Sequence, residues 1–170
     1  MGYDLYVKLL EEAIAEQKGT PKEAAPEAVI DFRVDANIPE YYISSSSGRM
    51  EIYKKISLIS TPEDADDVYD ELTDRYGTAP KSVERLLDVA LCRALAARSG
   101  IKRVELRGNT ILFIADKPDI ATWSEIYDKY KNGLIPPSAT APVAYRMRAN
   151  EDPTVVCRRI LTDYYKAANQ

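Results

Sequence analysis

The sequence predicts an α+β fold, in which a small antiparallel sheet packs with several helices in a single domain over residues 1–170. Apolar residues recur at helical spacing through the middle of the chain, at residues 50–98. They alternate with polar residues, as in strands, at 29–36 and again at 103–114. Because strands and helices do not alternate regularly, the pattern favours α+β over a doubly wound sheet.

The first predicted element is a helix over residues 1–19, which precedes a polar, proline-containing linker at 20–28 and a compact core at 29–170. The apolar stripe of this helix consists of Tyr3, Tyr6, Leu9, Leu10 and Ile14. The helical pattern begins almost at the first residue. A natural protein can begin in this way, and so can a fragment of a longer chain.

The core opens with a half-exposed strand at 29–36, whose apolar face carries Ile30, Phe32 and Val34. An irregular stretch follows, and it ends in the serine run Ser44–Ser47 before a short helix. That helix is predicted from its apolar stripe, which consists of Met50, Ile52, Tyr53 and Ile56. Hydroxyls before a helix can bind phosphate, but a turn whose last serines cap the helix is the favoured interpretation.

Two longer helices are predicted next. The first opens at Thr61 with Pro62 and Asp64, which supply a cap hydroxyl, a proline in the first turn and an early acid. Its apolar stripe is Ala65, Val68 and Leu72, and Gly77 is expected to close it as a left-handed cap. The second helix begins at Pro80 and ends at Gly100, and its inward stripe is Val83, Leu86, Leu87, Ala90, Leu91 and Leu95.

The last third of the chain returns to strand periodicity. Residues 103–107 and 110–114 flank Gly108-Asn109, a two-residue signal for a hairpin. A helix is expected over 119–131, then a loop and a strand at 143–148. Asp152 and Pro153 are expected to cap a final helix, whose stripe is Val156, Ile160, Leu161 and Tyr164.

The composition argues against an enzyme. The chain has no histidine, so it lacks the usual general base and the commonest metal ligand. Cys92 and Cys157 are far apart, and both are expected to be buried thiols rather than zinc ligands or a disulfide. No phosphate loop is present, no cofactor or metal is expected, and no apolar run is long enough to span a membrane.

Two alternatives use charged residues. Arg103 with Arg107, and Arg146 with Arg148, share strand faces that could contact nucleic acid, although a net charge of −4 opposes it. Clustered carboxylates such as Asp66 with Asp67 could belong to a hydrolase, but an acid-rich exposed helix needs no catalytic explanation.

The stretch DELTDRYGTAP, residues 70–80, is the strongest candidate site. Asp67, Glu71 and Asp74 form an acidic stripe on the predicted helix, with Asp70 beside it. Asp74 lies in the last turn, where the helix dipole disfavours an anion. In one interpretation, Asp74 caps the turn and Glu71 pairs with Arg75 at i,i+4. In the other, Glu71 and Asp74 receive arginines from another surface.

Five motifs occur in order: GYDLYVKLLEEAI, VDANIPEYYI, GRMEIYKKIS, ELTDRYGTAP and SGIKRVE. With them the chain resembles the C-terminal domain of the bacterial transcription-repair coupling factor family (Mfd), from Gly2 into the last helix. Two departures stand out: YISSSSGR replaces a turn with proline and acid, and DRYG replaces DRFG. The tyrosine keeps the aromatic ring of that motif.

The resemblance implies a fragment of a large ATP-driven DNA translocase in the bacterial cytoplasm, whose parent binds RNA polymerase, UvrA and DNA. It implies a non-catalytic, autoinhibitory domain that is monomeric in isolation and masks the UvrA-binding surface of the parent's UvrB-like N-terminal module. Glu71 and Asp74 are the implied contacts, with Asp67 and Asp70 beside them. The resemblance does not separate this partner from RNA polymerase.

Overall fold

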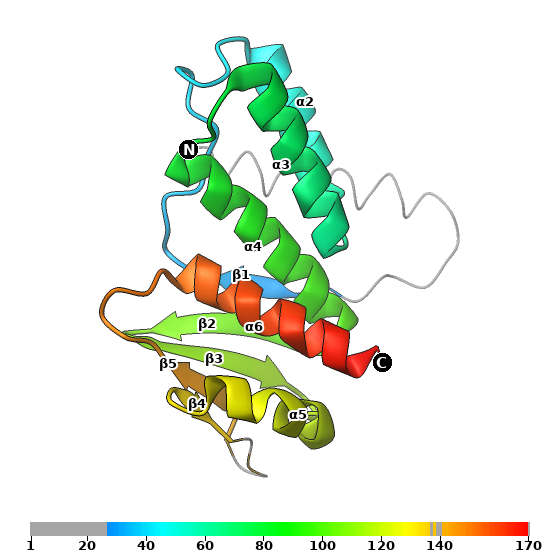
Figure 1. Ribbon diagram of the computed structural model, residues 1–170, viewed down its shortest axis with the longest axis vertical. Coiled ribbons are helices and arrows are strands. Elements are labelled where there is room, and N and C mark those ends of the chain that lie inside the picture. The colour runs from blue at the N-terminus through cyan, green and yellow to red at the C-terminus, as the bar shows by residue number, and fades with distance from the viewer. Residues whose placement is uncertain (1–26, 137, 139–140, 170) are drawn as a thin grey trace. The chain divides into compact units, whose positions relative to one another are not determined.

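The computed structural model describes residues 27–136, 138 and 141–169. Five helices and five strands lie in this part of the chain, so the α+β class is confirmed. They are β1 (Val29–Asp31), α2 (Ser46–Ser57), α3 (Pro62–Tyr76), α4 (Lys81–Arg98), β2 (Ile101–Arg107), β3 (Thr110–Ala115), α5 (Ile120–Tyr130), β4 (Leu134–Ile135), β5 (Val143–Arg146) and α6 (Pro153–Ala168) (Figure 1). The helix expected over 1–19 and most of the linker lie outside the described residues, and that division of the chain stays a prediction.

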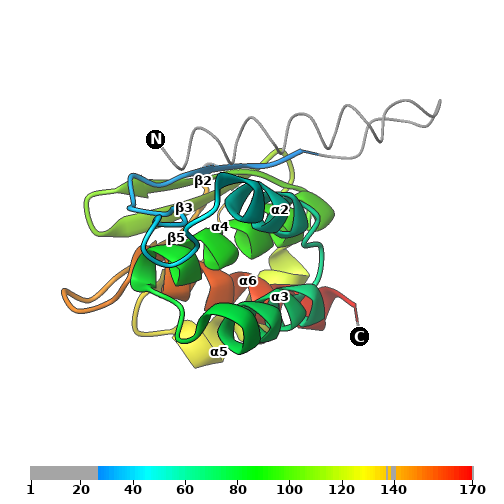
Figure 2. The ribbon, with the colours of Figure 1, turned by 90° about the horizontal axis from the view of Figure 1, so that it is seen from above.

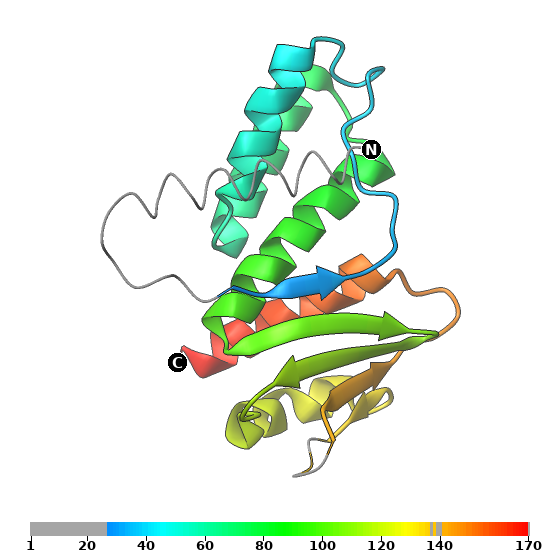
Figure 3. The ribbon, with the colours of Figure 1, turned by 180° about the vertical axis from the view of Figure 1, so that it is seen from behind.

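The chain forms two compact units, which are described separately. The first holds residues 34–91, and the second holds 27–33 together with 92–169 among the described residues. In the first unit, α2 and α3 lie side by side (Figures 1 and 3). Their packed sides carry Ile52, Tyr53, Ile56 and Leu72, which are all buried.

The second unit is built around a sheet with the strand order β1-β2-β3-β5-β4. The hairpin at Gly108-Asn109 forms as predicted, and Gly108 has the positive φ, +61°, that such a turn favours in glycine. Three of the four strand pairings are antiparallel, but β1 pairs with β2 in parallel, so the sheet is mixed. The sequence predicts an antiparallel sheet, and the parallel pairing of β1 with β2 is the one departure from it.

One row of buried side chains crosses the sheet. Ile30, Val104, Phe113 and Val143 are paired in register from β1 through β2 and β3 to β5. Helices α5 and α6 lie on one side of this sheet, as Figure 2 shows. Trp123 of α5 joins the sheet to α6. The centre of its ring lies 5.2 Å from that of Phe113 on β3 and 4.6 Å from that of Tyr164 on α6.

Several sequence details are corrected. Met50 was expected in an apolar stripe, yet it is 43% exposed, because Ile52, Tyr53 and Ile56 form the buried face of α2. Ile120 belongs to the apolar spacing that predicts the helix over 119–131, yet it is also exposed, since it is the first residue of α5. The first strand ends at Asp31 rather than at 36, and the expected loop after α5 contains the short strand β4. Cys92 and Cys157 are free and buried, as predicted.

Candidate protein-interaction site on helix α3

The start of α3 is fixed by a capping box. The Thr61 hydroxyl accepts a hydrogen bond from the Asp64 N–H at 3.1 Å, and the Asp64 carboxylate accepts one from the Thr61 N–H at 3.1 Å. The same carboxylate accepts from the N–H and the hydroxyl of Ser60, both at 3.0 Å. These hydrogen bonds, led by the one from the Ser60 N–H, lower the pKa of Asp64. The cap predicted from the sequence is confirmed.

The other end of α3 is fixed by a turn that precedes α2. Gly77 donates to the Thr73 carbonyl at 3.0 Å and has a positive φ of +84°, but its ψ of −167° is extended, so it is not the left-handed cap that the sequence predicts. The Tyr42 hydroxyl lies 2.8 Å from the Gly77 carbonyl and 3.2 Å from the Leu72 carbonyl. The Tyr42 hydroxyl can donate to either carbonyl, and this contact holds the last turn of α3 in place.

The side of α3 opposite to its buried residue is acidic. Leu72 is fully buried and anchors the helix. Asp67, Asp70 and Asp74 follow one another at i, i+3 and i+7, so they share a face, and all three are exposed. The exposed acids of α3 that form no ion pair with any described residue are Glu63, Asp66, Asp67, Asp70 and Asp74. We call these five residues the open acids.

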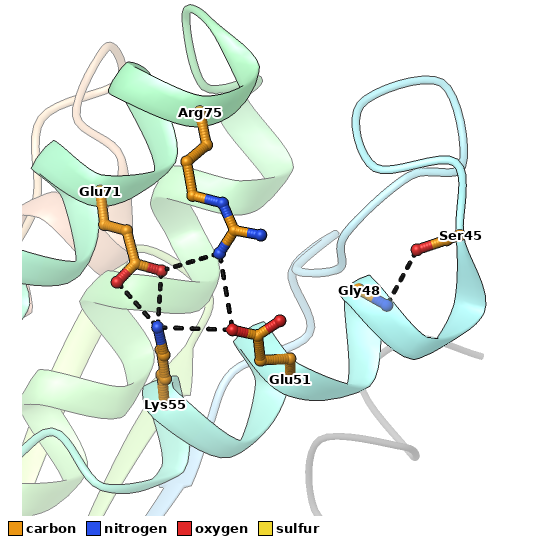
Figure 4. Close-up of polar contacts among 6 residues, drawn as sticks. All are labelled: Ser45, Gly48, Glu51, Lys55, Glu71 and Arg75. Atoms are coloured by element: carbon orange, nitrogen blue, oxygen red, sulfur yellow. Dashed lines mark hydrogen bonds and ion pairs between the residues drawn. The ribbon is translucent and has the colours of Figure 1, made fainter.

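Glu71 is arranged differently, because two cations already hold it. The Lys55 ammonium, from α2, donates to both carboxylate oxygens at 2.8 Å. The Arg75 guanidinium reaches one of them at 3.3 Å. Glu51 completes the group, with an oxygen 3.6 Å from Lys55 and 3.5 Å from Arg75. Figure 4 shows both cations pointing toward Glu71. We call Glu51, Lys55, Glu71 and Arg75 the ion-pair cluster.

The ion-pair cluster shifts the titration of its members. The hydrogen bond from Lys55 is the main cause that lowers the pKa of Glu71, and the same bond raises the pKa of Lys55. The sequence had indicated the pair between Glu71 and Arg75 at i,i+4, and that pair is present. It could not indicate Lys55, which comes from another helix, 16 positions earlier. Of the two predicted contacts, Asp74 is therefore open and Glu71 is already neutralised.

Two of the four predicted strand arginines are also paired. Arg103 of β2 contacts Asp31 of β1 and Glu105 of its own strand, each at 2.5 Å. Arg107 contacts the same Glu105 at 2.9 Å. The bond from Arg103 is the main cause that lowers the pKa of Glu105. We call Asp31, Arg103, Glu105 and Arg107 the strand network. Arg146 is exposed, but the remaining arginine of that predicted face, Arg148, lies beyond the end of β5.

Other candidate sites are less developed. Within the described ranges, no group of three or more histidine, cysteine or acidic side chains is arranged to hold a metal ion. No helix among the described residues has the length and apolar character needed to cross a membrane. In the serine run, the Ser45 hydroxyl accepts from the Gly48 N–H at 3.0 Å and caps α2, so a serine of the run caps the helix as predicted (Figure 4). The capping residue is not one of the last serines, because Ser46 and Ser47 already belong to α2.

Comparisons with known proteins converge on one family. The TRCF domain family matches residues 32–125. The chain is 39% identical over 116 residues to the transcription-repair-coupling factor of Staphylococcus epidermidis, which covers 67% of this chain and 10% of that protein. It is 38% identical over 113 residues to that of Staphylococcus aureus strain USA300, with 65% and 10% covered. The chain thus matches about a tenth of the length of these relatives.

A solved structure matches the fold. It is described as the C-terminal domain of transcription-repair coupling factor, and it superimposes with a TM-score of 0.65 over 84% of this chain and 92% of the other. The sequence identity in this comparison is 22%, so the likeness concerns the fold alone.

Proposed function

Because the chain belongs to the TRCF domain family of transcription-repair-coupling factors, we propose that it is the non-catalytic, autoinhibitory interaction domain of a bacterial transcription-coupled repair translocase. In this proposal it covers the UvrA-binding surface of the parent's UvrB-like module through the acidic side of α3. The observation that carries the proposal is the row of open acids on a helix that is capped at one end and held by Tyr42 at the other.

The chemistry of α3 suits a basic protein surface. Its open acids are exposed carboxylates, which accept charge-assisted hydrogen bonds from arginine in a bidentate geometry. Because the capped helix is already ordered, binding needs little loss of conformational freedom at this surface. Exposed charge pairs mainly give specificity and fast association, and they weaken as salt rises. Such an interface can be released when the parent changes conformation, as an inhibitory contact requires.

Asp74 has a local reason to bind a cation. It lies in the last turn of α3, where the negative end of the helix dipole disfavours an anion by about 0.3–1 kcal/mol. Arg75 is the only basic residue in the last turn, and its guanidinium is paired with Glu71 and Glu51. An arginine from the partner would offset the unfavourable charge, so Asp74 gains more from such a partner than an acid in the first turn does.

The wider activity belongs to the parent in the same proposal. The motor that hydrolyses ATP and moves along DNA, and the contacts with RNA polymerase and UvrA, would lie in the parts of the parent that this chain does not match. The domain itself would act as a monomer in the bacterial cytoplasm, without a cofactor. The 10% coverage of the relatives is consistent with a domain of this size within a much longer protein.

Calorimetry of the 170-residue chain with the UvrB-like module of its parent tests the proposal. The variant Glu71→Lys/Asp74→Lys reverses two charges on α3. The matched control Glu125→Lys/Asp128→Lys reverses two exposed acids at the same i,i+3 spacing on α5. We expect the wild type and the control to bind and the α3 variant to lose binding, with all three folded by circular dichroism.

Each other outcome is informative. If the α3 variant binds as well as the control, the acids of α3 do not form the interface. If the wild type does not bind at high protein concentration and low salt, the masking function is wrong, and RNA polymerase and DNA become the partners to examine.

A further inference from the structure

Glu71 presents a difficulty for any partner of α3, because its carboxylate is already held by Lys55 and Arg75. We propose that Arg75 is an internal competitor, which occupies Glu71 in the free domain and is replaced there by an arginine of the basic partner. Arg75 would then set the affinity of the interface. The inference rests on the proposed function, because it assumes that α3 binds a basic protein surface.

The distances identify Arg75, rather than Lys55, as the cation that leaves. Lys55 contacts both carboxylate oxygens of Glu71 at 2.8 Å, whereas Arg75 reaches only one, at 3.3 Å. Its contact with Glu51 is also long, at 3.5 Å. Lys55 comes from α2, so its departure would break the short ion pair that joins α2 to Glu71 of α3. Arg75 comes from α3 itself, so its release from Glu71 leaves that pair in place and gives up only the longer contact with Glu51 of α2.

Arg75 also contacts an aromatic ring. Its guanidinium carbon lies 5.0 Å from the centre of the Tyr76 ring, within the range of a cation–π contact. After exchange, the guanidinium can keep this contact while it gives up Glu71. Glu71 therefore exchanges one charge-assisted hydrogen bond for another. Lys55 stays paired with Glu71 and Glu51, and the Arg75 guanidinium keeps its contact with the Tyr76 ring.

The charge balance explains why such a competitor lowers affinity. The ion-pair cluster holds two cations and two carboxylates, so it is neutral in the free domain. An arriving arginine finds no net attraction there until Arg75 moves away. The open acids near it supply the long-range attraction, and Glu71 adds a contact only through exchange. An interface built in this way is weaker than the number of its acids suggests, which suits a contact that has to open.

The variant Arg75→Gln tests this inference in the same calorimetric assay. Removal of the competitor should lower the dissociation constant about 1.5- to 5-fold, the range that corresponds to one exposed ion pair. The matched control is Lys54→Gln, which also removes one positive charge near the site. Lys54 is exposed on α2 and forms no ion pair with the described residues. Its effect measures the general gain from a more negative surface, and we expect it to be smaller.

A double-mutant cycle isolates the competition. In a Glu71→Gln background, the carboxylate for which the two cations compete is gone. Arg75→Gln should then change the dissociation constant no more than Lys54→Gln does. If the gain persists in that background, the effect of Arg75 is general charge, and the competitor role is wrong.

The outcomes separate the two proposals. If the wild type binds and Arg75→Gln binds equally or more weakly than Lys54→Gln, Arg75 is not a competitor, while the proposed function stands. Weaker binding would mean that Arg75 itself contacts the partner. If neither the wild type nor Arg75→Gln binds the module, both the proposed function and this inference are overturned.

Discussion

Helix α3 in the first unit and the strand network in the second are both rich in charge, but their charges are organised in opposite ways. On β1 and β2, two arginines and two acids contact one another, so the strand network is neutral within itself. On α3, five open acids have no cation among the described residues, and only Glu71 belongs to an ion-pair cluster. Both surfaces are solvent-exposed, so exposure alone does not distinguish them.

The difference indicates which surface is available to a partner. A charge that is already paired offers little to another protein, because the new contact has to replace an existing one. Arg103 and Arg107, two of the four arginines that the sequence suggests for nucleic acid, are in that position. The five open acids of α3 are not. The comparison therefore favours α3 as a binding surface and predicts that its display depends on how firmly the helix is held.

The largest expected effect concerns the buried side of α3. Leu72→Ala should lower the free energy of unfolding by about 2–5 kcal/mol, because Leu72 is fully buried and its removal leaves a cavity. Urea denaturation measures this. Leu58→Ala is the control: Leu58 is 58% exposed, and its loss should cost less than about 0.5 kcal/mol. Equal effects of the two substitutions would mean that Leu72 does not anchor the helix that displays the open acids.

The start of α3 and its buried anchor Leu72 can be read from the sequence, because both depend on residues close together in the chain. The rest of the predicted stripe, Ala65 and Val68, is only half-buried, and Gly77 does not form the predicted left-handed cap. Thr61, Pro62 and Asp64 specify the start of the helix within four positions. The hairpin at Gly108-Asn109 was predictable for the same reason. These features follow from local backbone chemistry, which a single sequence expresses directly.

Contacts between distant segments were not readable. The parallel pairing of β1 with β2 joins residues more than seventy positions apart, and no local pattern specifies its direction. The bond from Lys55 to Glu71 depends on how α2 packs against α3. The exposed position of Met50 was missed because Ile52, Tyr53 and Ile56 could form an apolar face without it. The sequence therefore located the acidic helix correctly but could not tell an open acid from a paired one.

A smaller effect is expected at the cap of α3. Thr61→Ala removes the hydroxyl that accepts from the Asp64 N–H, and it should destabilise the protein by about 1 kcal/mol. The control is Thr73→Ala in the same helix, whose hydroxyl donates only to the Asp70 carbonyl, so its loss should have little effect. If both substitutions cost the same in thermal unfolding, the capping box contributes nothing particular to α3.

The pH dependence of Glu71 distinguishes it from the open acids. Its pKa is lowered in the folded protein, so its ion pairs stabilise the fold above the pKa of the unfolded chain. That contribution is lost as the pH falls through the lower folded value. The stability advantage of the wild type over Glu71→Gln should therefore be full at neutral pH and should disappear as the pH falls below the lowered pKa of Glu71, as followed by urea denaturation.

Nuclear magnetic resonance gives a direct check on the same carboxylate. Lys55→Met should move the titration midpoint of Glu71 back toward its ordinary range, because the hydrogen bond from Lys55 is the main cause of the shift. Lys54→Met should leave the midpoint in place. If neither substitution moves the titration midpoint of Glu71, Lys55 does not hold Glu71 in solution. The contrast between paired and open acids on α3 would then disappear.

The smallest expected effect tests the strand network. Glu105→Gln removes the only acid that contacts Arg107 among the described residues, whereas Arg103 keeps Asp31. The substitution thus frees Arg107. The variant should gain about one phosphate contact when it binds DNA. That contact should change the slope of the logarithm of the binding constant against the logarithm of the salt concentration by about −0.9. Asp116→Asn, which frees Lys102 at the other end of β2, is the control for a single released cation. The wild type should bind DNA more weakly than either variant in a fluorescence titration. If the wild type already binds with a steep salt dependence, the strand network is open in solution, and the nucleic-acid function that the sequence allowed regains its physical basis.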